Sequence, residues 1–310
     1  MSVENGEPDV VSYYGRPIIK APIWEPVIAW YFFFGGLAGA SAGLGLGARL
    51  ADNQRLARNA TYAGMAGVGV SPFVLIADLG RPERFYNMLR VIKVTSPMSV
   101  GTWILTGCGT ALGITSGCEA LGIFPRVKIA AQTVAGIMGL PLTTYTAALV
   151  ADTAVPVWHD ARRELPFVFA GSAAASAGAT AAITTPTKQA GPARRMAVAG
   201  ALLELAATKA MEYRLGPLIS EPYHEGAAGR LAKLAKACTA AGAALMALTG
   251  RRRTGSVVAG GLLLAGSLFE RKAVFRAGSQ SAADPKYVVV PQRERVEREG
   301  TQGTVRPSET

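Results

Sequence analysis

The sequence predicts an all-α, polytopic membrane protein, and the distribution of its charged residues is the main reason. Of the 310 residues, 50% are hydrophobic and only 17% are charged. Five runs contain no Asp, Glu, Lys or Arg, namely 26–48, 59–77, 94–118, 129–151 and 165–187. A helix needs about 20 apolar residues to cross the ~30 Å hydrocarbon core of a bilayer. These runs therefore exclude an ordinary soluble enzyme.

Three weaker runs follow and bring the expected number of transmembrane helices to eight. Residues 196–213 read as a helix but contain three charged residues, residues 231–250 carry two lysines at one end, and residues 254–269 are uncharged but short. Long lysine side chains extend to the membrane surface, which makes the second of these runs acceptable as a span.

Eight spans place both termini on one membrane side, here called side A. Side A also holds the loops 78–93, 152–164 and 214–230, whereas the short loops on side B carry many basic and few acidic residues. Short cytoplasmic loops are enriched in Lys and Arg. We therefore expect side B to be cytoplasmic and the termini to be extracytoplasmic, in the plasma membrane of a prokaryotic cell.

The two ends of the chain differ from the apolar middle. Residues 1–25 lack a basic segment followed by a small-residue cleavage site, so they are expected to be an extramembrane segment ahead of an uncleaved anchor. The tail 271–310 is charged and rich in Gln, Ser and Pro. Such a composition buries no core, which predicts a tail that is disordered or bound to a partner. The net charge of +11 favours contact with anionic membrane lipid rather than nucleic acid, because no aromatic residues are interleaved with a basic groove.

Small residues dominate one stripe of the first span. Gly35, Gly39, Gly43 and Gly47 recur every four residues. Helices associate inside lipid through close backbone contact, which small residues permit. The stripe predicts tight packing within the chain, with a dimer seam as the less favoured alternative.

The sequence offers no ligands for a redox metal. His159 and His224 both lie outside the apolar runs, whereas a cytochrome-b-type haem needs axial histidines within its helices. The three cysteines are scattered and form no CxxC motif, so neither an iron–sulfur cluster nor a zinc site is expected.

Several polar side chains are predicted to share the side-A half of the membrane. A helix rises 1.5 Å per residue, which places Trp30, Asp78 and Tyr145 close to side A. A quinone requires an apolar slot, donors for its two carbonyl oxygens and a route for protons, and these three residues are the candidates for binding it. Two alternatives remain open: Tyr145 as an interfacial belt tyrosine, and Asp78 as an ion-pair partner of Arg81 or Arg84.

Other ionisable residues are candidates for proton transfer. Asp152 and His159 occupy the loop after the fourth span, and Glu204 and Lys209 lie within the sixth. An ionisable residue inside a span is costly and therefore suggests a function. A solvated loop position for His159, and a purely structural role for a hydrogen-bonded Glu204, are the alternatives.

Three segments resemble the NrfD/PsrC family. They are WYFFFGGLAGASAG at 30–43, DLGRPERFYNMLRVIKVTSPMSVGTWIL at 78–105, and YTAALVADTAVPVWHDARRELPFVFAGSA at 145–173. The family comprises the membrane subunits of polysulfide reductase, nitrite reductase and formate dehydrogenase-like complexes. The resemblance covers most of residues 16–215.

The resemblance implies a fold and a site. It implies a cofactor-free subunit of eight transmembrane helices in two four-helix bundles, here 26–151 and 152–270. It also implies a pocket in the first bundle near side A that binds menaquinone or another quinone as substrate. Tyr145 resembles the pocket tyrosine of the family, and Asp78 begins its LGRP motif. A histidine and an asparagine of the polysulfide reductase subunit are absent here, where Trp30 offers an indole donor instead.

The resemblance also implies partners. A ferredoxin-like iron–sulfur subunit is expected to dock on side A and to link this chain to a catalytic subunit such as a molybdenum enzyme. The candidate docking residues are Arg81, Arg84, Arg162 and Arg163.

The expected function is that of a quinone-interacting subunit of a multi-subunit respiratory oxidoreductase, passing electrons between the iron–sulfur partner and the quinone pool, with proton translocation as an open question. The chain itself is either quinone-reactive or non-catalytic. One alternative is a secondary transporter, since Pro72 and Pro141 interrupt the second and fourth spans in similar places. The other is a purely structural membrane anchor.

Overall fold

The structure is a computed structural model that describes residues 18–20, 22, 27–77 and 81–299. Over these residues the chain forms eleven α-helices, three short 3-10 helices and no strand. The long helices are α1 (Ile28–Leu50), α2 (Gln54–Ala77), α4 (Pro97–Leu121), α5 (Pro125–Ala151), α7 (Leu165–Thr184), α8 (Gly191–Ser220), α9 (Gly226–Thr249) and α10 (Arg253–Ala283). The others are α3 (Asn87–Arg90), α6 (Pro156–Asp160) and α11 (Lys286–Glu299).

The all-α prediction is confirmed for the described residues. Each of the eight predicted spans overlaps one long helix. Five of these helices, α1, α2, α5, α7 and α9, are long and apolar enough to cross a membrane. The other three, α4, α8 and α10, are longer than α7 but have no stretch of comparably high mean hydropathy.

Proline and glycine residues set several helix ends. Pro97 and Pro125 occupy the first turns of α4 and α5, where a missing backbone N–H costs nothing. Gly122 ends α4 in the left-handed conformation, with φ of 67°. Gly216 adopts φ of 70° inside α8 and kinks that helix shortly before its end.

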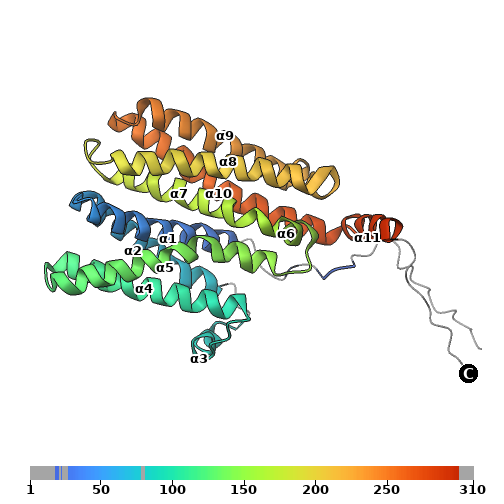
Figure 1. Cartoon of the computed structure of the whole chain (residues 1–310), viewed down its shortest axis with the longest axis horizontal. Helices are drawn as coiled ribbons and strands as arrows, with labels where there is room; N and C mark the ends of the chain where they lie inside the picture. Colours follow the sequence, from blue (N-terminus) through green and yellow to red (C-terminus); the bar gives the residue numbers. More distant parts are fainter. Residues whose placement is uncertain (1–17, 21, 23–26, 78–80, 300–310) are drawn as a thin grey trace, which may run out of the picture.

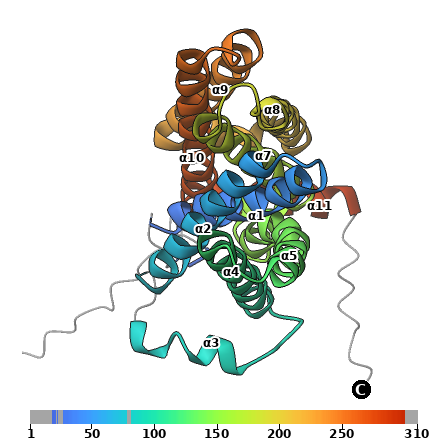
Figure 2. The same cartoon turned by 90° about the vertical axis from the view of Figure 1, so that its left-hand side faces the viewer.

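The names first group and second group are used here for helices α1, α2, α4 and α5 and for helices α7–α10, and contacts between the groups are as extensive as some within them. In one group α1 packs on α2 and α5, and α4 packs on α5 and α2; in the other α7 packs on α8 and α10, and α9 packs on α10 and α8. Contacts of α1 with α7 and α10 join the groups, and the end-on view places α1 and α7 in the middle (Figure 2). The turns 51–53, 122–124, 185–190 and 250–252 lie at one end of the assembly, which corresponds to side B, and α6 and α11 lie at the other (Figure 1).

Glycine permits the closest helix contacts. A Cβ atom on Gly39 of α1 would overlap the carbonyl oxygen of Gly139 on α5. Between α7 and α8, a Cβ on Gly171 would come within 2.8 Å of the carbonyl oxygen of Gly200. Gly39 therefore fulfils the packing role predicted for its stripe, whereas the two later glycines of the stripe have no neighbour within 4 Å.

A polar network ties the first group together at side B. Arg49 of α1 forms an ion pair of 2.8 Å with Glu119 of α4, which also pairs with Lys128 of α5 at 3.1 Å. Arg49 also donates a hydrogen bond to Gln132, whose amide donates to the Thr61 hydroxyl of α2 at 3.1 Å. The network thus connects all four helices of the group.

The predicted disorder of the tail from residue 271 onward is wrong for the described residues. Helix α10 continues through Arg271 to Ala283, and α11 follows. The physical reason is that small and apolar residues continue on the inner face beyond the charges. Trp158 of α6 donates a 2.7 Å hydrogen bond to the carbonyl oxygen of Val274 and lies so close to Gly278 that any Cβ there would overlap its ring.

Candidate functional site

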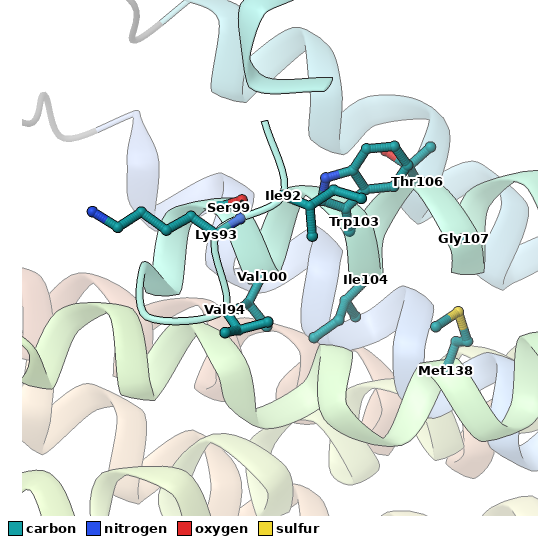
Figure 3. Close-up of a pocket in the computed structure, with 10 residues that line it drawn as sticks. All are labelled: Ile92, Lys93, Val94, Ser99, Val100, Trp103, Ile104, Thr106, Gly107 and Met138. Atoms are coloured by element: carbon teal, nitrogen blue, oxygen red, sulfur yellow. Dashed lines mark hydrogen bonds between the residues drawn. The ribbon is translucent and has the colours of Figure 1, made fainter. Parts of the chain in front are cut away.

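A cavity of about 470 Å³ lies against α4 and is called the α4 slot (Figure 3). It is lined by Ile92, Lys93, Val94, Ser99, Val100, Trp103, Ile104, Thr106, Gly107 and Met138. Its walls are almost wholly apolar, with Met138 of α5 near one end and Lys93 near the other, where the Lys93 side chain extends away from the remaining lining residues (Figure 3). Such a cavity has the size and character of a site for an apolar small molecule.

The segment before α4 forms one wall of the slot because several hydrogen bonds hold it there. The Ser99 hydroxyl donates to the carbonyl oxygen of Val91 at 3.0 Å and accepts from the backbone N–H of Lys93 at 3.0 Å. The indole N–H of Trp103 donates to the same carbonyl of Val91 at 3.3 Å. Two side chains of α4 therefore fix the loop that closes the slot.

Tyr145 lies beside the slot, in the seam between α4 and α5. Its ring fits against Gly101 so closely that a Cβ there would overlap it. The ring also meets Tyr31 of α1 edge-on, with 6.5 Å between centroids. Because the neighbour of Gly101, Val100, lines the slot, Tyr145 supports the slot from behind rather than lining it.

Trp30 occupies a different groove at the same end of the molecule. It is 37% exposed, stacks on Phe34 with 6.0 Å between centroids, and has the Lys272 ammonium 4.6 Å from its ring centre. Together with Phe275 and Arg276 it lines a cavity of about 280 Å³ between α1 and α10. The structure therefore does not bring Trp30 and Tyr145 into one cavity.

Asp78, the third predicted binding residue, lies outside the described residues. The last turn of α2 before it, including Leu75 and Ile76, lines a second cavity of about 290 Å³. Phe85 and Met88 also line this second cavity. Thr106 lines both this cavity and the α4 slot. This cavity and the α4 slot thus lie on adjoining faces of α4.

The polar candidates of the side-A loops are accessible. Asp152 and His159 are exposed between α5 and α7. The four predicted docking arginines, Arg81, Arg84, Arg162 and Arg163, are exposed as well, and none forms an ion pair with a described residue. The loops therefore present solvated cations on one end of the molecule.

In α8, Glu204 is buried with 2% exposure, whereas Lys209 is exposed. The carboxylate of Glu212, one helical turn after Lys209, pairs instead with Lys236 of α9 at 2.5 Å. The structure therefore keeps Glu204 as an interior group and places Lys209 on the outer surface.

Sequence reasoning missed the residues that line the slot and two charges of the second group. Trp103 and Lys93 lie within the 78–105 segment that carries the resemblance, which was the available signal. Glu270 and Arg271 are buried with 3% and 1% exposure. The sequence pattern that indicates their burial is the series of small residues that continues past them in α10. Uncharged runs alone do not reveal this pattern.

These features define an all-helical membrane protein with an apolar slot near one end and basic loops beside it. A family model described as polysulfide reductase, of the NrfD type, matches residues 10–284. The chain belongs to this family, and it is a membrane subunit of a multi-subunit respiratory oxidoreductase. A comparison with curated proteins gives no match.

Proposed function

We propose that this chain is the subunit through which its complex exchanges electrons with membrane quinone. In this proposal all eight long helices cross the bilayer as two bundles of four, with α1, α2, α4 and α5 in the first and α7–α10 in the second. The observation that carries the proposal is the α4 slot, an apolar cavity of about 470 Å³ near side A with polar groups at its rim. The substrate is menaquinone or another quinone, whose apolar ring and tail suit such walls.

Lys93 gives the slot one hydrogen-bond donor for a quinone oxygen. It is exposed and forms no ion pair with a described residue, so its flexible side chain is free to turn its ammonium toward one carbonyl oxygen. A fixed cation stabilises the negative charge that develops when that oxygen is reduced. The Ser99 hydroxyl and the Trp103 indole N–H both donate to the Val91 carbonyl, so they hold the wall of the slot in place, and Tyr145 holds α4 behind it.

The electrons come from or go to an iron–sulfur subunit docked on side A. Arg81, Arg84, Arg162 and Arg163 form a basic surface that complements an acidic partner. Docking there brings the partner to the same end of the molecule as the slot. Asp152 and His159, both exposed at this end, exchange the protons that accompany two-electron quinone chemistry with the extracytoplasmic side.

The proposal is tested with Lys93→Gln and Trp103→Phe in the complete complex reconstituted with quinone. Quinone-linked turnover should fall at least about tenfold, because Lys93→Gln removes a cationic donor to a reacting oxygen and Trp103→Phe releases the wall segment that is held at Val91. Electron transfer from the catalytic subunit to a soluble dye should stay unchanged. Lys188→Gln, in the turn between α7 and α8 at the far end, serves as the matched control.

A space-filling variant provides a second arm. Thr106→Phe adds bulk to an exposed wall residue of the slot and should block quinone access without disturbing the core. Ile137→Phe, on the exposed face of α5, should have no effect. Unchanged quinone turnover in both Lys93→Gln and Thr106→Phe would contradict the proposal and leave the chain as a structural anchor.

A further inference from the structure

Three charged side chains are buried in the second helix group. Glu204 of α8 is 2% exposed, and Glu270 and Arg271 of α10 are 3% and 1% exposed. They are the only charged side chains in the buried class among the described residues. Burial of a charge is expensive unless it is paired or hydrogen-bonded, and inside a membrane it marks a functional group by default.

The cluster is not fully satisfied by hydrogen bonds. Arg271 donates one bond, from Nη2 to the carbonyl oxygen of Phe169 at 2.8 Å, while its Nε and Nη1 atoms have no partner. Glu204 accepts from the Thr239 hydroxyl at 3.1 Å through Oε1, while Oε2 has none. The charges of Glu204, Glu270 and Arg271 all act on one another. The unpaired Glu204 oxygen is suited to take up a proton, and the unpaired Arg271 N–H groups are suited to donate to water.

Charge balance points to one bound proton. Two carboxylates and one guanidinium leave a single negative charge when all three are ionised. The neighbouring Glu212 and Lys236 are paired at 2.5 Å and cancel each other. Neutrality in a membrane interior is strongly favoured, so one carboxyl group must hold a proton for the cluster to be neutral.

A polar route leads from the cluster to side A. Glu212 follows Glu204 by two helical turns, about 12 Å nearer to side A. Glu212 and Lys236 are half-buried, and both charges act on Glu270. Beyond them Tyr223 lies buried in the turn before α9, and its hydroxyl has no hydrogen-bond partner.

Along the α7–α8 contact, the opposite direction is tightly packed and largely apolar. Between Glu204 and side B the core of the group consists mainly of alanine, including Ala175, Ala179, Ala197 and Ala201. Gly178 lies against the backbone of Ala197, which leaves no room between α7 and α8. In the described residues no charged side chain is buried in this half.

We propose that Glu204, Glu270 and Arg271 form a site that holds one proton, exchanges it with side A past Glu212, Lys236 and Tyr223, and does not open to side B. The step is a proton transfer from water on side A to a carboxylate, with no change in covalent bonds or electron count. The role of the site rests on the proposed function: a proton stored there balances negative charge when quinone is reduced.

A row of aromatic rings places this site beside the first helix group. Phe169, under the Arg271 guanidinium, contacts Phe32 with 6.1 Å between centroids. Phe32 contacts Tyr31, and Tyr31 contacts Tyr145 beside the α4 slot. Through these packed rings, a change of charge on the quinone and a change of protonation at the cluster influence each other.

The test is infrared spectroscopy of the whole complex inserted in one orientation in vesicles. Shifting the pH only on side A should change the absorbance of protonated carboxyl groups shielded from water. Shifting it only on side B should leave that absorbance unchanged. Glu204→Gln combined with Glu270→Gln should abolish the signal, whereas Glu225→Gln, an exposed residue at side A, should retain it.

Single variants keep the test decisive if the double variant fails to fold. Lys236→Gln should slow the side-A response at least about tenfold, and Lys233→Gln, exposed on the same helix, should not. A response to side-B pH, or a signal unchanged in Glu204→Gln and in Glu270→Gln, would overturn the inference. The spectra need no quinone turnover, so failure of the proposed function would appear separately, as absent quinone-linked activity in the unmodified complex.

Discussion

The guanidinium of Arg271 lies 3.7 Å from the centre of the Phe169 ring while donating a hydrogen bond to the carbonyl oxygen of the same residue. This double contact joins α10 to α7. On its other side the guanidinium approaches Gly36 of α1, where a Cβ would come within 3.2 Å of Nη2. One side chain thus occupies the point where the two helix groups meet.

Replacing Arg271 with Lys should destabilise the protein by about 2–4 kcal/mol, although the charge is kept. An ammonium group lacks the planar fork that stacks on Phe169 and donates to its carbonyl at the same time. The measurement is thermal or denaturant unfolding of the purified chain in detergent. The control is Arg276→Lys, one turn further along and exposed. Equal stability of the two variants would show that the double contact contributes nothing.

Gly278→Ala should destabilise the chain by about 1–3 kcal/mol, because the added methyl group would occupy the space of the Trp158 ring and force repacking of α6 against α10. Gly261→Ala is the matched change in α10, since nothing lies within 4 Å of its Cβ position. That variant should be neutral or slightly stabilising. Loss of the native tryptophan fluorescence would report the displacement of Trp158, and an undisturbed spectrum would contradict the prediction.

Gly101→Ala should displace the Tyr145 ring and lower quinone-linked turnover at least about tenfold, because small misplacements of a binding wall are costly for reactivity. Gly113→Ala, in the same helix with open space around it, is the control. Turnover is measured in the reconstituted complex beside dye-linked activity of the catalytic subunit. Full quinone turnover in Gly101→Ala would show that the position of the Tyr145 ring does not matter for the quinone site.

The attachment of α11 should depend on pH. Lys286 donates a 2.9 Å hydrogen bond to Glu221, which holds the pKa of Glu221 below its ordinary value of 4.5 and raises the pKa of Lys286 above its ordinary 10.5. The stabilisation by Glu221 is therefore present above pH 4.5 and lost as the pH falls through its lowered pKa. The stabilisation by Lys286 is complete below pH 10.5 and lost as the pH rises through its raised pKa.

Hydrogen exchange of the α11 amides checks this dependence. Protection should be constant through neutral pH and fall in acid. Lys286→Gln should lower protection already at neutral pH, whereas Arg293→Gln, exposed in the same helix, should not. Identical protection in acid and at neutral pH would show that the pair does not hold the helix.

The positions of the long helices were largely predictable from the sequence, because uncharged runs must bury their backbone hydrogen bonds in helices. The end of α10 was not, since a count of charges stops at Arg271 even though the inner face continues with small residues. Trp158 and Gly278 are far apart in the chain, so their contact leaves no local pattern.

The candidate site was predictable only in part. Tyr145 lies within the last two turns of α5, as its place in the sequence indicates, but the slot beside it depends on how the segment around Lys93 folds back on α4 through Ser99 and Trp103. Glu204 was recognised as an intramembrane charge, whereas its neighbours come from other helices. Such cross-helix relationships follow from the helix packing and not from spacing along the chain.

Photolabelling with a light-activated quinone analogue is the most direct measurement of where the quinone binds. The complete complex is labelled in its membrane, and the modified peptides of this chain are mapped. Labels are expected on residues of the α4 slot, within 92–107 and around Met138, and excess unmodified quinone should compete with them. Labels confined to α7–α10, or labels that excess quinone does not displace, would contradict it.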